Sequence, residues 1–154
     1  MKVIALTTML MVAAGVGVAM GDTSGPVVLP KQAPATATPS AEQEYNRGLQ
    51  ARTQKDWGTA VGAFTRATEL RGAFPEAWNE LGYALRNQGR YPESVAAYDR
   101  ALKLRPRYPE ALEYLGEAYV KMGRLDDARK ILDRLKPLDT ARAKELEEEI
   151  AKGK

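Results

Sequence analysis

The side chains that most often carry enzyme chemistry are scarce in this sequence of 154 residues. It contains no cysteine and no histidine, which removes thiolate nucleophiles, Cys/His zinc sites and imidazole acid–base catalysis. Its only serines are Ser24, Ser40 and Ser94, and none has a histidine to serve as its base. No Gly-rich turn ends in the Gly-Lys-Ser/Thr sequence that cradles phosphates. The sequence therefore predicts a protein that is not an enzyme and that has no cofactor.

Two clusters of charged side chains are the remaining candidates for ligand binding. The run between Glu145 and Glu149 is acidic, but acids along an amphipathic helix are typical of a solvated face, and we predict no metal site there. The densest basic cluster falls at the end of one predicted helix and comprises Arg100, Lys103, Arg105 and Arg107. Cations at that end complement the helix dipole. Because the net charge is only +3, we predict no nucleic-acid partner.

From residue 41 onward the sequence has a repeat with a period of 34 residues. The residues of this repeat must position any binding surface. Segments 41–74, 75–108 and 109–142 align without gaps. One column of the alignment holds glycine in all three segments, at Gly48, Gly82 and Gly116. Three further columns hold residues of one kind in all three segments. They are the large residues Trp57, Tyr91 and Leu125, the small residues Ala60, Ser94 and Ala128, and the large apolar residues Phe64, Tyr98 and Leu132. Such a period is the signature of a repeat architecture.

Each period contains two helical patterns. In the second period, Trp78, Leu81 and Leu85 recur at i, i+3 and i+7, which places them on one helix face. Gly89 ends this helix, and Tyr91-Pro92 begins the next. We expect the small residues of the glycine and Ala/Ser columns to let the two helix backbones approach closely. The large residues of the Phe64, Tyr98 and Leu132 column should fill the space between the small ones.

In these residues the sequence resembles the tetratricopeptide repeat (TPR) family. The motif is clearest in the second period, which carries Trp78-x-x-Leu81-Gly82-x-x-Leu85, Gly89-x-Tyr91-x-x-Ser94, Tyr98, Ala101 and Pro106. The first period departs from the family pattern, with Lys55 in place of the loop glycine and Gly72 in place of the terminal proline. The resemblance implies an all-α fold, a right-handed α-solenoid of three helix-turn-helix units over 41–142 that is completed by a capping helix.

The capping helix is predicted over residues 140–151. Ala143, Leu146 and Ile150 form its apolar stripe, and Asp139 or Thr140 can cap its start. Pro137 arrives three residues before the position of the family's terminal proline. We therefore expect an altered turn into this helix.

The resemblance also implies a concave groove, lined by the first helix of each repeat, that binds a protein or peptide partner. The positions that face such a groove hold Tyr45, Leu49 and Arg52, then Asn79, Tyr83, Arg86 and Asn87, and then Glu113, Glu117 and Lys121. Aromatic rings, forked guanidinium donors and amides suit recognition of a peptide. The alternative is that Tyr83 only covers the seam between repeats and that the arginines pair with Glu80 or Glu117.

One family subtype is not predicted. Some members bind the C-terminal carboxylate of a chaperone through a clamp of Lys and Asn side chains. The matching positions here hold Tyr45, Leu49, Glu80, Glu110 and Tyr114. A ligand that ends in EEVD is therefore not expected.

The N-terminal segment is predicted to be a secretory signal over residues 1–21. Lys2 precedes an uncharged run from 3 to 20, and Ala19-Met20-Gly21 is a cleavage site of small residues. The alternative is an uncleaved membrane anchor, because the run is at the lower limit for spanning a bilayer. Residues 22–40, rich in Pro, Thr and Ala, are predicted to be a disordered linker.

Together these patterns predict a non-catalytic adaptor whose TPR domain, residues 41–154, binds a protein or peptide. The signal indicates export to the periplasm or cell envelope of a bacterium, with membrane contact only through an uncleaved N-terminal segment. The alternative is a self-associating structural component of an envelope assembly, a homo-oligomer, because three repeats are close to the minimum for a stable stack.

Overall fold

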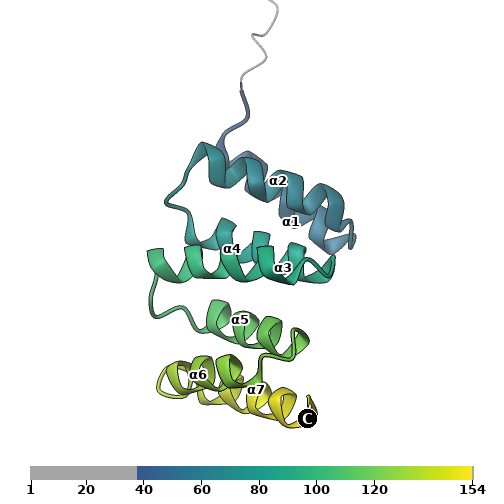
Figure 1. Ribbon diagram of the computed structural model, residues 1–154. Helices are drawn as coiled ribbons and strands as arrows, with labels where there is room; N and C mark the ends of the chain where they lie inside the picture. Colours follow the sequence, from purple (N-terminus) through teal and green to yellow (C-terminus); the bar gives the residue numbers. More distant parts are fainter. Residues whose placement is uncertain (1–37, 154) are drawn as a thin grey trace, which may run out of the picture. The chain divides into compact units, whose positions relative to one another are not determined.

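Helices alone make up the part of the chain that the structure describes. The computed structural model describes residues 38–153, so the expected signal segment and most of the expected linker lie outside the described residues. The helices are α1 (Ala41–Thr53), α2 (Trp57–Leu70), α3 (Pro75–Asn87), α4 (Tyr91–Leu104), α5 (Pro109–Lys121), α6 (Leu125–Leu135) and α7 (Thr140–Lys152). Figure 1 shows them stacked in chain order, each pair on the next. The predicted all-α solenoid is confirmed.

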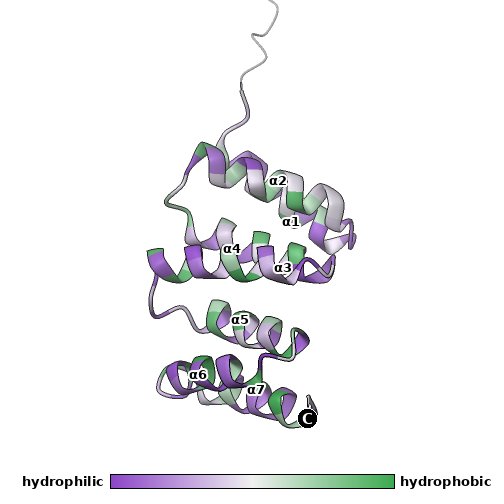
Figure 2. Ribbon diagram, viewed as in Figure 1, coloured by the Kyte–Doolittle hydropathy of each residue, from purple (hydrophilic) through white to green (hydrophobic). Residues whose placement is uncertain are grey.

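Local sequence signals fix where the helices begin. Ser40 caps α1 with its hydroxyl, which accepts the backbone N–H of Gln43 at 3.2 Å, and the Gln43 side chain accepts the backbone N–H of Ser40 at 2.7 Å. Pro75 and Pro109 occupy the first positions of α3 and α5, where their fixed φ suits a helix and no N–H is required. Figure 2 shows apolar and polar residues alternating around the helices, as expected of helices that bury one face.

The packing of each helix pair depends on a glycine in its first helix. A β-carbon added at Gly82 would lie 2.7 Å from the ring of Tyr98, and one added at Gly48 would lie 2.5 Å from the ring of Phe64. Both rings are completely buried. The small and large columns of the sequence therefore meet as expected in the first two repeats.

The third repeat differs, because its glycine is covered from a different helix. The side chain that a β-carbon at Gly116 would meet is Leu146 of α7, and not Leu132 of α6. Expecting Leu132 to fill this space was wrong, since leucine is shorter than the phenylalanine and tyrosine of the same column. The capping helix thus completes the core of the last repeat.

The turn into the capping helix is altered as Pro137 indicates. Helix α6 has 11 residues, whereas α2 and α4 have 14 each. Asp139 then caps α7 by accepting the backbone N–H groups of Ala141 and Arg142 at 3.1 and 3.0 Å. Helix α7 packs on both α5 and α6. Within residues 38–153, no helix has the combination of length and apolar character that crossing a membrane requires.

We expect Gly82→Ala to lower the free energy of unfolding by about 1–3 kcal/mol, because the added methyl group must displace the buried ring of Tyr98. Urea unfolding followed by circular dichroism measures this change. Gly62→Ala is the matched control, since a β-carbon there meets nothing within 4 Å. That change should stabilise the exposed helix position by up to about 1 kcal/mol. Equal effects at both glycines would contradict the close approach.

Candidate partner-binding groove

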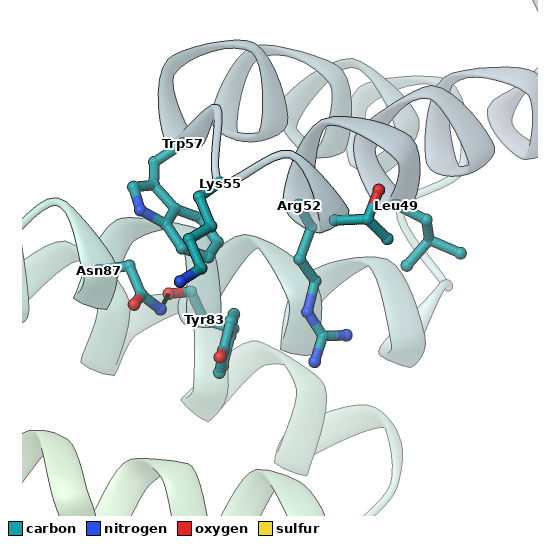
Figure 3. A pocket seen from close by; sticks show the side chains of 7 residues that line it. Leu49, Arg52, Lys55, Trp57, Tyr83 and Asn87 are labelled. Carbon is teal, nitrogen blue, oxygen red and sulfur yellow. Dashed lines mark hydrogen bonds between the residues drawn. The ribbon is translucent and has the colours of Figure 1, made fainter.

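An open cavity of about 740 Å³ lies where the turn between α1 and α2 faces α3 (Figure 3). Its lining residues are Leu49, Arg52, Thr53, Lys55, Trp57, Tyr83 and Asn87. The structure thus brings together four of the predicted groove residues, Leu49, Arg52, Tyr83 and Asn87. A second cavity, of about 340 Å³, shares Asn87 and is lined also by Arg86, Tyr91 and Lys121.

Tyr83 lies in the middle of a row of aromatic rings that joins the three repeats. Its ring centroid is 5.9 Å from that of Trp57 in the first repeat and 5.2 Å from that of Tyr114 in the third. The guanidinium carbons of Arg52 and Arg86 lie 4.5 and 5.4 Å from the Tyr83 ring centroid, within reach of a cation–π interaction. Tyr83 therefore both covers the seam between repeats and forms a wall of the first cavity.

Ion pairs tie each first helix to the next one. Arg52 of α1 donates from Nη1 to both carboxylate oxygens of Glu80 on α3, at 2.9 and 3.0 Å. Arg86 of α3 pairs with Glu117 of α5. The pairing of both arginines that the sequence left open as an alternative is thus observed, and neither guanidinium is a free anion receptor.

Burial sets the electrostatics of this surface. It raises the pKa of the Glu80 carboxyl, although the Arg52 guanidinium acts in the opposite direction. Burial also raises the pKa of Glu113, again against the effect of its ion-pair partner, Arg142 of α7. Burial, and then the Glu110 carboxylate, raise the pKa of Tyr114 to about 12, so its hydroxyl remains a neutral hydrogen-bond donor.

Two of the predicted groove residues are not accessible. Asn79 is completely buried and Glu113 is only 3% exposed, so the expectation that they face a ligand is wrong. Both occupy the fifth position of their helices, and this position points between repeats. Tyr45 occupies the same position in α1 and packs on Phe74, with ring centroids 4.9 Å apart. Tyr45 is therefore partly buried against the core.

Sequence reasoning missed Thr53, Lys55 and Trp57 in the first cavity and Tyr91 in the second. It considered only face positions of the first helices, whereas three of these residues belong to turns or second helices. A signal was present at Lys55, which departs from the family pattern at the loop glycine. Within residues 38–153, no group of three acidic side chains is arranged to hold a metal ion.

Comparison with known proteins agrees with this fold. A family model described as TPR repeat matches residues 82–123. No curated protein matches the chain. The described part of the chain therefore has the fold of TPR domains, and the TPR repeat model matches the segment in which the motif residues are clearest.

Several solved structures of similar fold are TPR domains with low sequence identity. The TPR2B domain of yeast Sti1, in its pHsp70 complex, is 22% identical with a TM-score of 0.69, and the match covers 73% of this chain and 94% of that one. The Arabidopsis OM64 TPR domain is 21% identical, with a TM-score of 0.70 and coverages of 73% and 95%. The second TPR domain of human RPAP3, in complex with the HSP70 peptide SGPTIEEVD, is 21% identical, with a TM-score of 0.68 and coverages of 72% and 94%.

We expect Arg52→Met to lower the free energy of unfolding at pH 7 by about 1–3 kcal/mol, because it leaves the buried Glu80 carboxylate without its partner. Burial already raises the pKa of Glu80, so folding favours its protonated form. The stability conferred by protonation is present at low pH and is lost as the pH rises through the folded-state pKa. The destabilisation should therefore shrink as the pH falls from 7 to 5.

Urea unfolding of the variant and the wild type at both pH values measures this difference. The control is the double variant Arg52→Met with Glu80→Gln, which has no carboxyl at this position. The difference in the free energy of unfolding between this double variant and the wild type should therefore not contain the pH dependence that an unpartnered carboxyl causes. A cost of Arg52→Met that is the same at pH 5 and pH 7 would refute the role assigned to Glu80.

Proposed function

We propose that the TPR domain is a non-catalytic interaction module that binds a peptide segment of a partner protein along its groove. The observation that carries the proposal is the cavity of about 740 Å³ beside Tyr83, which joins the first two repeats and has aromatic, amide and cationic walls. Such a lining offers contact area with few rotatable bonds together with hydrogen-bonding groups. The peptide-bound TPR domain of human RPAP3 supports the proposal as a protein of the same fold.

The partner peptide is proposed to differ from the EEVD peptide of that neighbour. The positions that would clamp a terminal carboxylate hold Tyr45, Leu49, Glu80, Glu110 and Tyr114. Glu80 is already paired with Arg52, and Glu110 forms no ion pair among residues 38–153. A terminal carboxylate placed beside Glu110 would be repelled, because like charges at close range are unfavourable.

The test is a selection of random displayed peptides on the full chain, followed by dissociation constants for the synthetic peptides. We expect Tyr83→Ala to weaken the affinity for the selected peptides by about ten-fold or more, because buried aromatic anchors carry much of the binding energy. Asn87→Ala, which alters an exposed cavity residue, should weaken them without loss of helix content. Leu104→Ala is the control, because Leu104 is 43% exposed on α4 and lines neither cavity of the groove.

Unchanged affinity in both groove variants would refute the groove as the binding surface. Circular dichroism shows whether each variant keeps its helices. A loss of binding in Leu104→Ala alone would instead place the peptide on the second helices.

We also propose that the protein is exported to the cell envelope, on the basis of the uncharged run after Lys2 and the small residues Ala19-Met20-Gly21. Mass spectrometry of the protein isolated from its native cells should then find an N-terminus at Asp22. An N-terminus at Met1 in the membrane fraction would favour the anchor over the cleaved signal.

A further inference from the structure

The turn between α1 and α2 contains a lysine in a backbone conformation that favours glycine. Lys55 has a φ of +57°, and no other residue except glycine has a positive φ among residues 38–153. Its counterparts in the next two repeats are Gly89 and Gly123, with φ values of +75° and +72°. The three turns have the same hydrogen bonds, since each of these residues donates its N–H to a carbonyl three positions earlier, at 2.9–3.0 Å.

This conformation is unfavourable for a residue with a β-carbon. The turn itself does not require lysine, because glycine forms the same turn twice in this chain. The surroundings of the lysine side chain are therefore the place to look for a role. Figure 3 shows that this side chain extends from the turn, beside Trp57, toward the space between Asn87 and Tyr83.

Lys55 gives the cavity an uncompensated positive charge. It forms no ion pair with any residue in the range 38–153, and no acidic residue lines the cavity. The other cation in the lining, Arg52, is neutralised by its contact with both oxygens of Glu80. The cavity therefore offers one ammonium group whose charge no described residue balances.

Apolar and aromatic side chains lie around this ammonium, together with the polar Thr53 and Asn87. Trp57 and Tyr83 meet edge to face, with their rings 66° apart, and Leu49 adds an aliphatic side chain. Asn87 is held in place because its Nδ2 donates to the backbone carbonyl of Tyr83 at 2.8 Å. A single negative charge next to apolar side chains is the chemistry that complements such a site.

We propose that this cavity is an anchor pocket for the side chain of an internal Asp or Glu of the partner peptide. Lys55 pairs with the carboxylate, and an apolar neighbour of the acidic residue contacts the rings of Trp57 and Tyr83. The proposal rests on the proposed peptide-binding function and adds its sequence preference. One carboxylate balances the one free ammonium, whereas a phosphoryl group with nearly two charges would need further donors.

The experiment titrates the full chain with two peptides, Ac-Gly-Leu-Glu-Leu-Gly-amide and the same peptide with Gln in place of Glu. The indole N–H resonances of the two tryptophans report binding by NMR. Trp57 lines the pocket, whereas Trp78 is an internal reference because its indole donates to the Gly72 carbonyl outside the groove. We expect the Glu peptide to shift Trp57 and to bind about five-fold or more tightly than the Gln peptide, and added salt to reduce this preference.

Lys55→Gly separates a binding role from a structural one. Glycine relieves the left-handed conformation, so we expect the melting temperature to rise by about 3–6 °C. The preference for Glu over Gln should disappear in the same variant. Lys55→Arg keeps the charge and should keep the preference. The control is Lys144→Ala, which removes an exposed lysine of α7 that forms no ion pair among residues 38–153.

Equal affinity of the two peptides for the wild type, or an unchanged preference in Lys55→Gly, would overturn the proposal. So would the absence of any Trp57 shift with the Glu peptide at about 5 mM. These results leave the proposed function standing if the selected peptides still lose affinity in Tyr83→Ala. If the selected peptides bind that variant as well as the wild type, the groove itself is refuted.

Discussion

The contact between a glycine of one helix and a buried ring of the next is the constraint on which the rest of the structure depends. At Gly82 the absence of a β-carbon lets the ring of Tyr98 lie against the helix backbone. This close approach sets the separation of α3 and α4 and thereby presents the other side of α3 to the groove. Because Gly48 and Phe64 repeat the contact, α1 presents the same side, and Leu49, Arg52 and Tyr83 meet around one cavity.

The ion pairs between first helices follow from this arrangement and limit what the groove can bind. Arg52 with Glu80 and Arg86 with Glu117 connect successive repeats and leave no net charge at those positions. Each pair is partly shielded from water, so separating it to bind a ligand would leave a carboxylate or guanidinium without a partner. Under the proposed function, recognition by charge therefore belongs to Lys55 and Lys121, which are exposed near the turns and form no ion pair among residues 38–153, rather than to the arginines that the sequence favoured.

The fold could be predicted from the sequence because its signals are local and repeated. The glycine column and the prolines at helix starts act within a few residues, and the 34-residue period repeats them. Pro137 correctly indicates an altered turn into α7. The role of Leu146 could not be predicted in this way. It depends on how α7 docks beside Gly116, and that docking is set by the combined shape of α5 and α6.

The site was predicted only in part, for a similar reason. Face positions identify Arg52, Tyr83 and Asn87, but the same rule includes Asn79, which the neighbouring repeats bury completely. Burial by a neighbouring repeat is not encoded in the period of a single helix.

Lys55 shows how a departure from a repeat pattern carries information that the pattern itself does not. A repeat that loses its loop glycine gives up some stability, and the loss is tolerated in a domain whose other contacts are intact. Drift alone would allow many residue types at this turn, including the asparagine that adopts the left-handed region more readily. A long cation that extends into the cavity beside Tyr83, where it forms no ion pair with a described residue and no acidic residue is part of the lining, is a more specific outcome. The unfavourable backbone conformation and the positive charge in the cavity both belong to Lys55. Because Lys55→Gly removes both, this one substitution can distinguish a lysine retained for binding from one that arose by drift.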